Sequence, residues 1–132
     1  MSERNVELVR RLYANFAAGE ETPLASFTAD FELDATDVAP DGSVVRGIEA
    51  AEAEMQSYWN TFDDFHVEIE EVIHADDEHV VCVVRDGGRI RGSDAEVSNR
   101  FFNVFTFCDG RIARQSFHTD RNRALAAAGL LE

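Results

Sequence analysis

Two strand-like segments joined by Asp109-Gly110 constrain the fold of this chain more than any other feature. Residues 101–107 are rich in phenylalanine, and residues 111–118 alternate between apolar and polar side chains. An Asp-Gly pair between such segments favours a two-residue type I′ turn, because both central positions of that turn need a positive φ. The sequence therefore predicts an antiparallel hairpin close to the C-terminus.

A two-residue loop also fixes which residues face one another across the hairpin. The facing pairs predicted by this register are Phe105/Arg114, Asn103/Ser116 and Phe101/His118. One face of the hairpin then combines phenylalanine rings with polar side chains, and Asp120 follows on the same face. Isolated polar groups among aromatic rings are costly to bury unless they form hydrogen bonds or take part in chemistry. We therefore expect the functional site on this face.

The 132 residues form one domain, residues 1–132, which is long enough to bury a core. Apolar residues at helical spacing predict helices over residues 3–18, 48–62 and 121–128, the last ended by Gly129. Strand patterns cover residues 30–36 and four segments after residue 62, with a β-bulge at Glu70-Glu71 and a turn or bulge at Asp86-Gly87-Gly88. This order predicts an α+β fold, in which a curved, mostly antiparallel sheet wraps around the N-terminal helices.

The charge of the chain restricts its partners. It has 26 acidic residues against 12 arginines and no lysine, which gives a net charge of −14. Binding to a polyanion requires a basic surface, so we expect neither nucleic acid nor an anionic membrane as a partner. The N-terminus lacks the apolar stretch of a signal peptide, and Cys82 and Cys108 lack metal-ligand spacing, which favours a reducing, cytoplasmic location. No motif for a metal or a phosphate group is present, so we expect no metal and no cofactor.

Five local phrases, taken in order, resemble a known superfamily. They are residues 9–20 (VRRLYANFAAGE), 27–30 (FTAD), 47–50 (GIEA), 62–65 (FDDF) and 109–120 (DGRIARQSFHTD). Together they resemble the nuclear-transport-factor-two-like superfamily, and within it the SnoaL-like polyketide cyclases, ketosteroid isomerases and limonene-epoxide hydrolases. The likeness covers nearly the whole chain and implies a cystatin-like cone. It leaves the function open, because this fold carries enzymes, binding modules and dimerisation domains.

Asp120 has two interpretations. In the cyclases and epoxide hydrolases that the chain resembles, an aspartate at this position is the general base, and an apolar pocket raises the pKa of a carboxylate toward a useful range. Alternatively, Asp120 caps the helix that begins at Arg121, which is a common role of aspartate. Thr119 is a second candidate for that cap. The sequence leaves both interpretations open.

His118 and Asn103 accompany Asp120 in the predicted site. His118 is either a proton shuttle that orients Asp120 or a histidine packed on Phe101. Asn103 falls where the ketosteroid isomerases place the protonated acid of their oxyanion hole, so the resemblance implies that its amide stabilises a developing enolate. Its other interpretation is a structural amide at a bulge.

Three further positions bear on the resemblance. Tyr13 lies one residue out of register with the second oxyanion donor and is expected at the pocket or in the core. Asp86 aligns with an acid of the epoxide hydrolases, but Val84 replaces the arginine that partners it there, and Asp86-Gly87-Gly88 is typical of a turn. The base of the isomerases corresponds to Ala35, which disfavours a steroid isomerase.

The resemblance and the hairpin together give a functional hypothesis. We expect a homodimer with an apolar pocket, in which Asp120, His118 and Asn103 carry out cofactor-free acid–base chemistry on a small hydrophobic carbonyl or epoxide compound. The residues expected to line the pocket are Tyr13, Trp59, Phe101, Phe105, Arg114 and Ser116. The dimer is expected because Phe102, Val104 and Phe117 would lie on an outer face that needs covering. The alternative is a non-catalytic ligand-binding or dimerisation module of the same fold.

Overall fold

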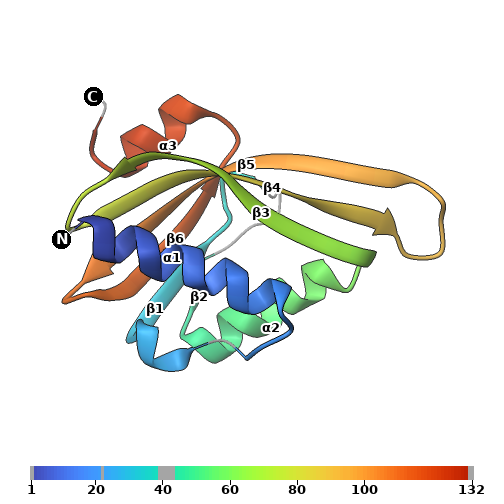
Figure 1. The fold of residues 1–132 in the computed structure, drawn as a ribbon, viewed down its shortest axis with the longest axis horizontal. Coiled ribbons are helices and arrows are strands. Elements are labelled where there is room, and N and C mark those ends of the chain that lie inside the picture. Colours follow the sequence, from blue (N-terminus) through green and yellow to red (C-terminus); the bar gives the residue numbers. More distant parts are fainter. Residues whose placement is uncertain (1, 22, 39–43, 131–132) are drawn as a thin grey trace.

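The computed structural model describes residues 2–21, 23–38 and 44–130, and it has the predicted α+β architecture. Its elements are α1 (Ser2–Ala17), the 3-10 helix η1 (Leu24–Ser26), β1 (Phe27–Asp34), β2 (Val44–Arg46), α2 (Ile48–Trp59), β3 (Phe62–Ala75), β4 (His79–Ile90), β5 (Glu96–Cys108), β6 (Arg111–His118) and α3 (Arg121–Ala127). The strands of the described part form one sheet in the order β2-β1-β6-β5-β4-β3 (Figure 1). β1 and β6 pair in parallel and the other neighbours are antiparallel.

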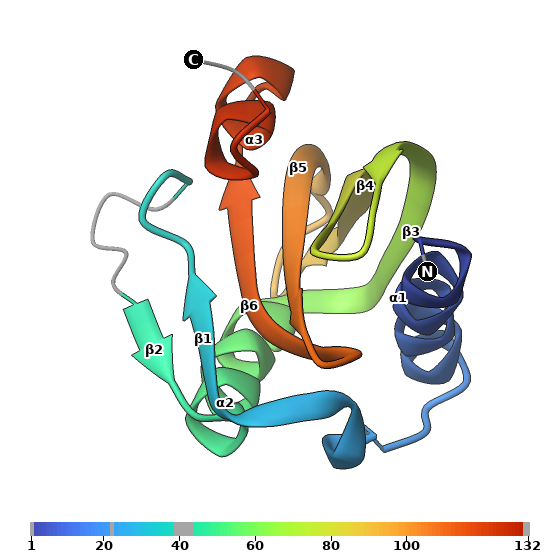
Figure 2. The same cartoon turned by 90° about the vertical axis from the view of Figure 1, so that its left-hand side faces the viewer.

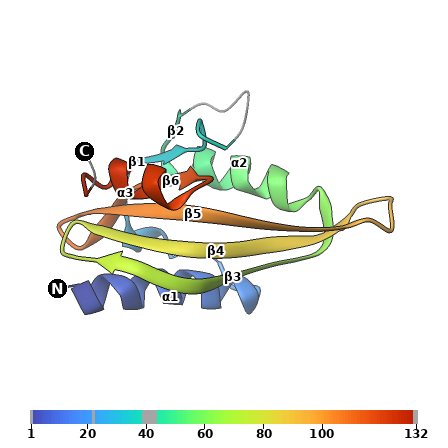
Figure 3. The same ribbon diagram turned by 90° about the horizontal axis from the view of Figure 1, so that it is seen from above.

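The sheet has two faces that carry different helices. α1 packs mainly on β3 and β4, and α2 mainly on β1 and β2, so both helices lie on the side that we call the inner face (Figures 2 and 3). α3 lies on the opposite side, the outer face, over β5 and β6. The inner face of the two middle strands, β5 and β6, therefore lies between the two long helices. This is the surface on which the site is built.

Alternation along β4 sends apolar side chains to both faces. Val80, Cys82 and Val84 join the inner core with Val9 of α1, whereas Val81 joins the outer core. Each of these side chains is at most 2 % exposed, and full burial of a valine contributes about 1.5–3 kcal/mol. The continuous apolar run over residues 80–84 is thus explained by burial on both sides.

α3 is short but has defined ends. Asp120 caps its N-terminus, and the amides of Gly129 and Leu130 return to the carbonyls of Ala126 and Leu125, which is the Schellman arrangement. Gly129 has φ 75°, a left-handed conformation that glycine adopts at little cost. The predicted end of this helix at Gly129 is confirmed.

Two local predictions about the sheet are also confirmed. Asp109 and Gly110 have φ 53° and 78°, as a type I′ turn requires. The register of β3 against β4 shifts between Ile69 and Glu71, which places the predicted bulge at Glu70. No helix of the described residues is long and apolar enough to cross a membrane.

The argument for a dimer loses its structural support. Val104 is 1 % exposed because Ala124 and Ala128 of α3 cover it, and Phe102 packs against the same cluster. Phe117 lies on the inner face and packs against the inner core. Of the apolar residues expected to need a second subunit, Val104 is therefore covered within the chain, Phe102 is partly covered, and Phe117 lies on the other face.

Candidate functional site

The hairpin between β5 and β6 contains a bulge that the sequence did not reveal. Phe107 faces Ile112 as predicted, but the register shifts after this pair, so that Thr106 faces Arg114. Ala113 is the extra residue of the bulge. A shift of one residue changes every facing pair beyond it, and the predicted pairs of Asn103 with Ser116 and of Phe101 with His118 are wrong.

The shift divides the predicted site between the two faces of the sheet. Asn103 now faces Phe117, and Phe102 faces His118. Because neighbouring residues of a strand point to opposite faces, Asn103 lies on the inner face and His118 on the outer face. Arg114 and Ser116 share the outer face with His118 and do not line the inner face as predicted. Arg114 binds the carboxylates of Asp34 and Glu32.

Of the two interpretations of Asp120, the structure shows the helix cap. Its Oδ1 accepts a hydrogen bond of 2.8 Å from the backbone amide of Arg123, and its side chain is 55 % exposed. This carboxylate therefore lies in solvent at the start of α3, remote from the apolar surroundings that the catalytic interpretation assumed.

His118 belongs to an outer-face network that links three elements. Its Nδ1 lies 2.9 Å from Asp37 Oδ2 and its Nε2 lies 2.9 Å from Ser116 Oγ, while Arg123 donates to Asp37 Oδ1 at 2.5 Å. The hydrogen bond from His118 is the largest cause of the lowered pKa of Asp37. The order Ser–His–Asp matches a nucleophilic triad, but Ser116 is 1 % exposed, so its hydroxyl is out of reach of a substrate. The network fixes the segment after β1 to β6 and α3.

Asn103 and Tyr13 form the first polar feature of the inner face. Asn103 Nδ2 donates a hydrogen bond of 3.0 Å to the hydroxyl of Tyr13, which lies on α1. Asn103 as a whole residue is 4 % exposed. Within the described residues, Asn103 Oδ1 is buried and has no hydrogen-bond partner. Burial raises the pKa of Tyr13 above its ordinary value, so the hydroxyl stays protonated.

Asp86 forms the second polar feature, and it brings together β4, β5 and α2. The Asp86 side chain continues the inner-face alternation of β4 and lies opposite Asn99 of β5. Its Oδ1 accepts hydrogen bonds from the Tyr58 hydroxyl at 3.1 Å and from Asn99 Nδ2 at 3.2 Å. Asn99 Nδ2 also lies 3.2 Å from the Tyr58 hydroxyl oxygen, which closes the triangle.

The electrostatics of Asp86 are those of a proton acceptor. Asp86 is 6 % exposed, and burial raises the pKa of its carboxyl above the ordinary value of 3.8. The hydrogen bonds from Asn99 and Tyr58 oppose this rise only in part. Both hydrogen bonds end on Oδ1, so Oδ2 accepts none from the part of the chain that the structure describes. A buried carboxylate with one free oxygen and a raised pKa is suited to accepting a proton.

Of the turn or bulge predicted at Asp86-Gly87-Gly88, the turn is wrong, because β4 continues to Ile90. The register of β3 against β4 does shift at this place, between Asp63 and His66, and the extra residue lies in β3. A Cβ at Gly87 would lie 1.9 Å from the carbonyl oxygen of Val97, so this glycine permits close approach of β5. The Asp-Gly-Gly sequence concealed a strand residue. The sequence pattern that could have revealed the inner-face position of Asp86 is the alternation of Val80, Cys82 and Val84, because residue 86 is the next position of that series.

The aromatic residues expected to line the pocket have ring partners within the chain. Phe105 is 1 % exposed and packs edge-on against Tyr13, with 6.3 Å between ring centroids. Phe101 stacks with Phe117 at 6.4 Å, and both rings are half-buried on the inner face. Trp59 is the last residue of α2, and its ring packs on that of Phe16 of α1, with 4.4 Å between the centroids.

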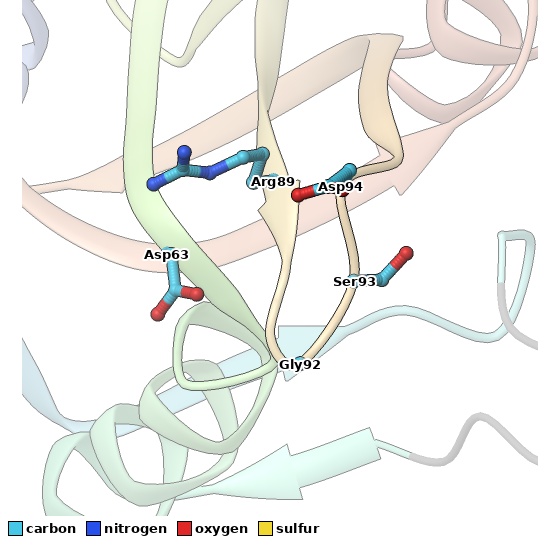
Figure 4. Close-up of a pocket in the computed structure, with 5 residues that line it drawn as sticks. All are labelled: Asp63, Arg89, Gly92, Ser93 and Asp94. Carbon is cyan, nitrogen blue, oxygen red and sulfur yellow. The ribbon is translucent and has the colours of Figure 1, made fainter.

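Two surface depressions of the described residues lie elsewhere. One of about 300 Å³ is lined by Asp63, Arg89, Gly92, Ser93 and Asp94, beside the turn between β4 and β5 (Figure 4). A second of about 430 Å³ lies nearby and includes Asp64, which forms an ion pair of 2.9 Å with Arg89. Both are open and charged, and neither includes Asp86 or Asn103. Residues 2–21, 23–38 and 44–130 contain no group of three His, Cys, Asp or Glu side chains placed to hold a metal.

Comparison with known proteins gives a family match and a set of similar folds. The family model described as SnoaL-like domain matches residues 9–115, a range that includes Asp86 and Asn103 but ends before His118 and Asp120. No curated protein matches the chain.

Three solved structures illustrate the likeness. Bal32a, from a soil-derived mobile gene cassette, is 24% identical with a TM-score of 0.76, and 89% of each chain is covered. A protein of Jannaschia sp. CCS1 assigned as a SnoaL-like polyketide cyclase is 23% identical with a TM-score of 0.75, covering 98% of this chain and 92% of that one. TerC, co-crystallised with polyporic acid, is 18% identical with a TM-score of 0.74, covering 96% and 97%. At these identities the likeness concerns the fold.

Proposed function

Because the chain belongs to the SnoaL-like family, we propose that it is an acid–base enzyme that acts on a small hydrophobic molecule at the inner face of its sheet. The observation that carries this proposal is the buried Asp86 carboxylate, held on one oxygen by Tyr58 and Asn99. Asp86 replaces Asp120 as the proton acceptor. The sequence has no motif for a metal or a phosphate-bearing cofactor, which fits chemistry carried out by side chains alone.

In this proposal Asp86 Oδ2 takes a proton from a carbon next to a carbonyl group of the substrate. The C–H bond breaks, its electron pair forms the carbon–carbon double bond of an enolate, and negative charge develops on the former carbonyl oxygen. Tyr58 and Asn99 both donate to Asp86 Oδ1, so they position the carboxylate and leave Oδ2 to take the proton. Where a carbon–carbon double bond is conjugated to the enolate, return of the proton from Asp86 to the far carbon of that bond completes an isomerisation. Where the enolate carbon attacks a second carbonyl group, the oxygen of that group takes the proton from Asp86 and completes a cyclisation.

Asn103 takes a different part from the one that the sequence suggested. Along β5 it lies four residues from Asn99, the partner of Asp86, which corresponds to about 13 Å at roughly 3.3 Å per residue. A carbonyl oxygen lies only a few ångströms from the carbon that loses its proton. Asn103 therefore does not lie beside an enolate formed at Asp86, and its hydrogen bond to Tyr13 joins β5 to α1.

The alternative is a binding module that performs no chemistry. The deep burial of Asp86 favours it, because a residue with 6 % exposure has little contact with solvent for the exchange of protons. The homodimer and the cytoplasmic location expected from the sequence stay predictions.

Deuterium exchange tests the proposal without knowledge of the natural substrate. 2-Tetralone, a bicyclic ketone with acidic C–H groups, is incubated with the protein in D₂O, and loss of the C–H signals is followed by NMR. We expect the wild type to accelerate exchange over buffer, and Asp86→Asn to reduce this acceleration by about 10²–10⁴-fold.

A matched control removes a carboxylate elsewhere. Glu68 is exposed on β3, on the outer face opposite Arg85, and Glu68→Gln should exchange 2-tetralone at the wild-type rate. Equal rates for the wild type and Asp86→Asn contradict the role of Asp86. A wild type that binds 2-tetralone without accelerating exchange supports the binding module.

A further inference from the structure

We propose that Tyr58 is a movable gate over Asp86, whose ring covers the carboxylate in this structure and rotates outward to give access to Oδ2. The inference deepens the proposed function, because it concerns access to the same site, and it rests on that function for the existence of a ligand. The cover itself and its opening are tested without any substrate.

Asp86 is enclosed by its neighbours on the inner face. It is 6 % exposed, and neither of the two depressions described above includes it. Val84 and Gly88 occupy the adjacent inner-face positions of β4, and Val67 and Asn99 face Asp86 from β3 and β5. A molecule therefore reaches the carboxylate only after one of its neighbours moves.

Tyr58 is the neighbour that is free to move. It is the next-to-last residue of α2, and it is 38 % exposed although its hydroxyl lies 3.1 Å from the buried carboxylate. Its backbone is held, because its carbonyl oxygen accepts hydrogen bonds from the amide and the hydroxyl of Thr61. Val84 and Val67, by contrast, pack in the inner core. Rotation of the exposed side chain into solvent thus uncovers Asp86 and leaves the core and the helix in place.

Two kinds of contact hold the gate closed. The Tyr58 hydroxyl donates to Asp86 Oδ1, and its oxygen lies 3.2 Å from Asn99 Nδ2. The Tyr58 ring packs edge-on against Phe62 and Phe65, with 5.3 Å and 5.8 Å between the centroids. The hydrogen bond is charge-assisted, so it is the stronger single contact. The closed state therefore depends on the same carboxylate that it covers.

The bulge in β3 builds the surface on which the gate rests. Phe62 and Phe65 are three residues apart, and in a regular strand they would point to opposite faces. The register shift between Asp63 and His66, with Asp64 at φ 57°, brings both rings to the same side, where both contact Tyr58. A left-handed conformation is uncommon for a residue other than glycine, and here it gives the gate a fixed aromatic seat.

Titration of Asp86 distinguishes a cover from a simple hydrogen-bond donor. Burial raises the pKa of this carboxyl, and the hydrogen bond from Tyr58 lowers it by a smaller amount. Tyr58→Ala admits water to the carboxylate, so the pKa should fall below that of the wild type. Tyr58→Phe keeps the cover and loses the donor, so the pKa should rise. Each pKa is measured by NMR from the ¹³C shift of the Asp86 carboxyl carbon.

Chemical labelling measures how often the gate opens. A water-soluble carbodiimide with glycine ethyl ester converts accessible carboxyl groups into amides, which mass spectrometry locates. The labelling rate of Asp86 is divided by its protonated fraction from the titration. Tyr58→Phe should raise this rate by about tenfold or more, because one hydrogen bond to a charged group no longer holds the ring. Tyr58→Ala should be labelled faster still.

Two controls accompany these measurements. Glu68 is exposed on the outer face of β3, and its labelling rate should be the same in every variant. Tyr13→Phe is the matched substitution, because it removes a tyrosine hydroxyl that binds Asn103 and not Asp86. It should leave Asp86 at the wild-type labelling rate.

Three results would overturn the proposal. They are labelling of Asp86 at the wild-type rate in Tyr58→Phe, equal acceleration in Tyr13→Phe, and a pKa of Asp86 that rises in Tyr58→Ala as it does in Tyr58→Phe. If Tyr58→Ala does not fold, the labelling rates of Tyr58→Phe and Tyr13→Phe decide the question. Neither measurement involves 2-tetralone or the transfer of a proton from carbon, so failure of the gate and failure of Asp86 as a base are distinguishable.

Discussion

The side chain of Asp120 accepts a hydrogen bond of 2.8 Å from the backbone amide of Arg123, so the residue expected to be the base of the site holds the start of α3 instead. This helix covers Val81 and Val104 on the outer face through Ala124 and Ala128. The cap therefore contributes to the burial of a second core, and its loss affects stability before it affects chemistry.

Asp120→Ala should lower the free energy of unfolding by about 1 kcal/mol, because the amide of Arg123 loses its acceptor. Asp120→Ser should recover most of this loss, since serine is also a good N-cap. Thr119→Ala is the control, because Thr119 is exposed and does not make the cap. Urea unfolding measures all three, and the capping role would be refuted by equal losses for Asp120→Ala and Thr119→Ala.

Asp86→Asn should make the protein more stable at pH 7. The pKa of Asp86 is raised in the folded state, so the folded protein holds this proton more tightly than the unfolded chain. The contribution of Asp86 to the free energy of unfolding therefore falls as the pH rises above 3.8, the ordinary pKa of an aspartate. The melting temperature of the variant, relative to the wild type, should rise between pH 4 and pH 7, and a constant difference across this range would contradict a raised pKa.

Tyr13 and Asn103 should be energetically coupled. Tyr13→Phe leaves the buried Asn103 amide without its partner, and we expect a loss of about 1–3 kcal/mol. Asn103→Leu removes both groups of that amide, so adding Tyr13→Phe to it should cost little more. A double-mutant cycle from urea unfolding should give a coupling of about 1 kcal/mol, and additive losses would show that the hydrogen bond contributes nothing.

Asp76 should make the stability of the fold depend on pH in acid. The hydrogen bond from His74, followed by those from the backbone amides of Glu78 and His79, lowers the pKa of Asp76 from 3.8 to about 2. A lowered pKa contributes stability that is present above the unfolded value and is lost as the pH falls from about 4 to about 2. The melting temperature of Asp76→Asn should therefore change less over this range than that of the wild type. Glu78→Gln, an exposed neighbour, should behave as the wild type does.

Gly87→Ala should disturb the Asp86 site through the backbone. The new methyl group would meet the carbonyl oxygen of Val97 at 1.9 Å, so β4 and β5 must separate where Asp86 faces Asn99. We expect a loss of about 3 kcal/mol or more in the free energy of unfolding. Gly92→Ala is the comparison, because its methyl group meets nothing within 4 Å and only its φ of 81° carries a cost of about 1–2 kcal/mol. Similar losses at both glycines would remove the steric explanation.

The order of elements followed from local patterns. Helical spacing predicted α1 and α2 to within a few residues, Asp109-Gly110 predicted the type I′ turn, and the phase break after Ile69 predicted the bulge at Glu70. Each depends on interactions between residues close in sequence, such as turn geometry, capping and the side on which apolar residues gather. Together with the resemblance to a known superfamily they were sufficient for the fold class, which the family match and the similar folds confirm.

Which residues come together in the site depended on two local features of the sheet, a bulge in β6 and the extension of β4. The extra residue at Ala113 moved His118 and Ser116 to the outer face, away from Asn103. The extension of β4 through Gly87 and Gly88 placed Asp86 among buried side chains instead of in a turn. Neither event has a strong local signature, because a bulge and a glycine inside a strand are stabilised by the neighbouring strands.

The sequence by itself thus determined the architecture, the turn of the final hairpin, the capped C-terminal helix and the presence of buried polar residues among aromatic ones. Only the tertiary structure decided which polar residues share a face: Asn103 with Tyr13, Asp86 with Tyr58 and Asn99, and His118 with Asp37. The physical reason is the two-residue period of a strand. One inserted residue reverses the face of every side chain beyond it, whereas the apolar pattern that selects the fold tolerates that change.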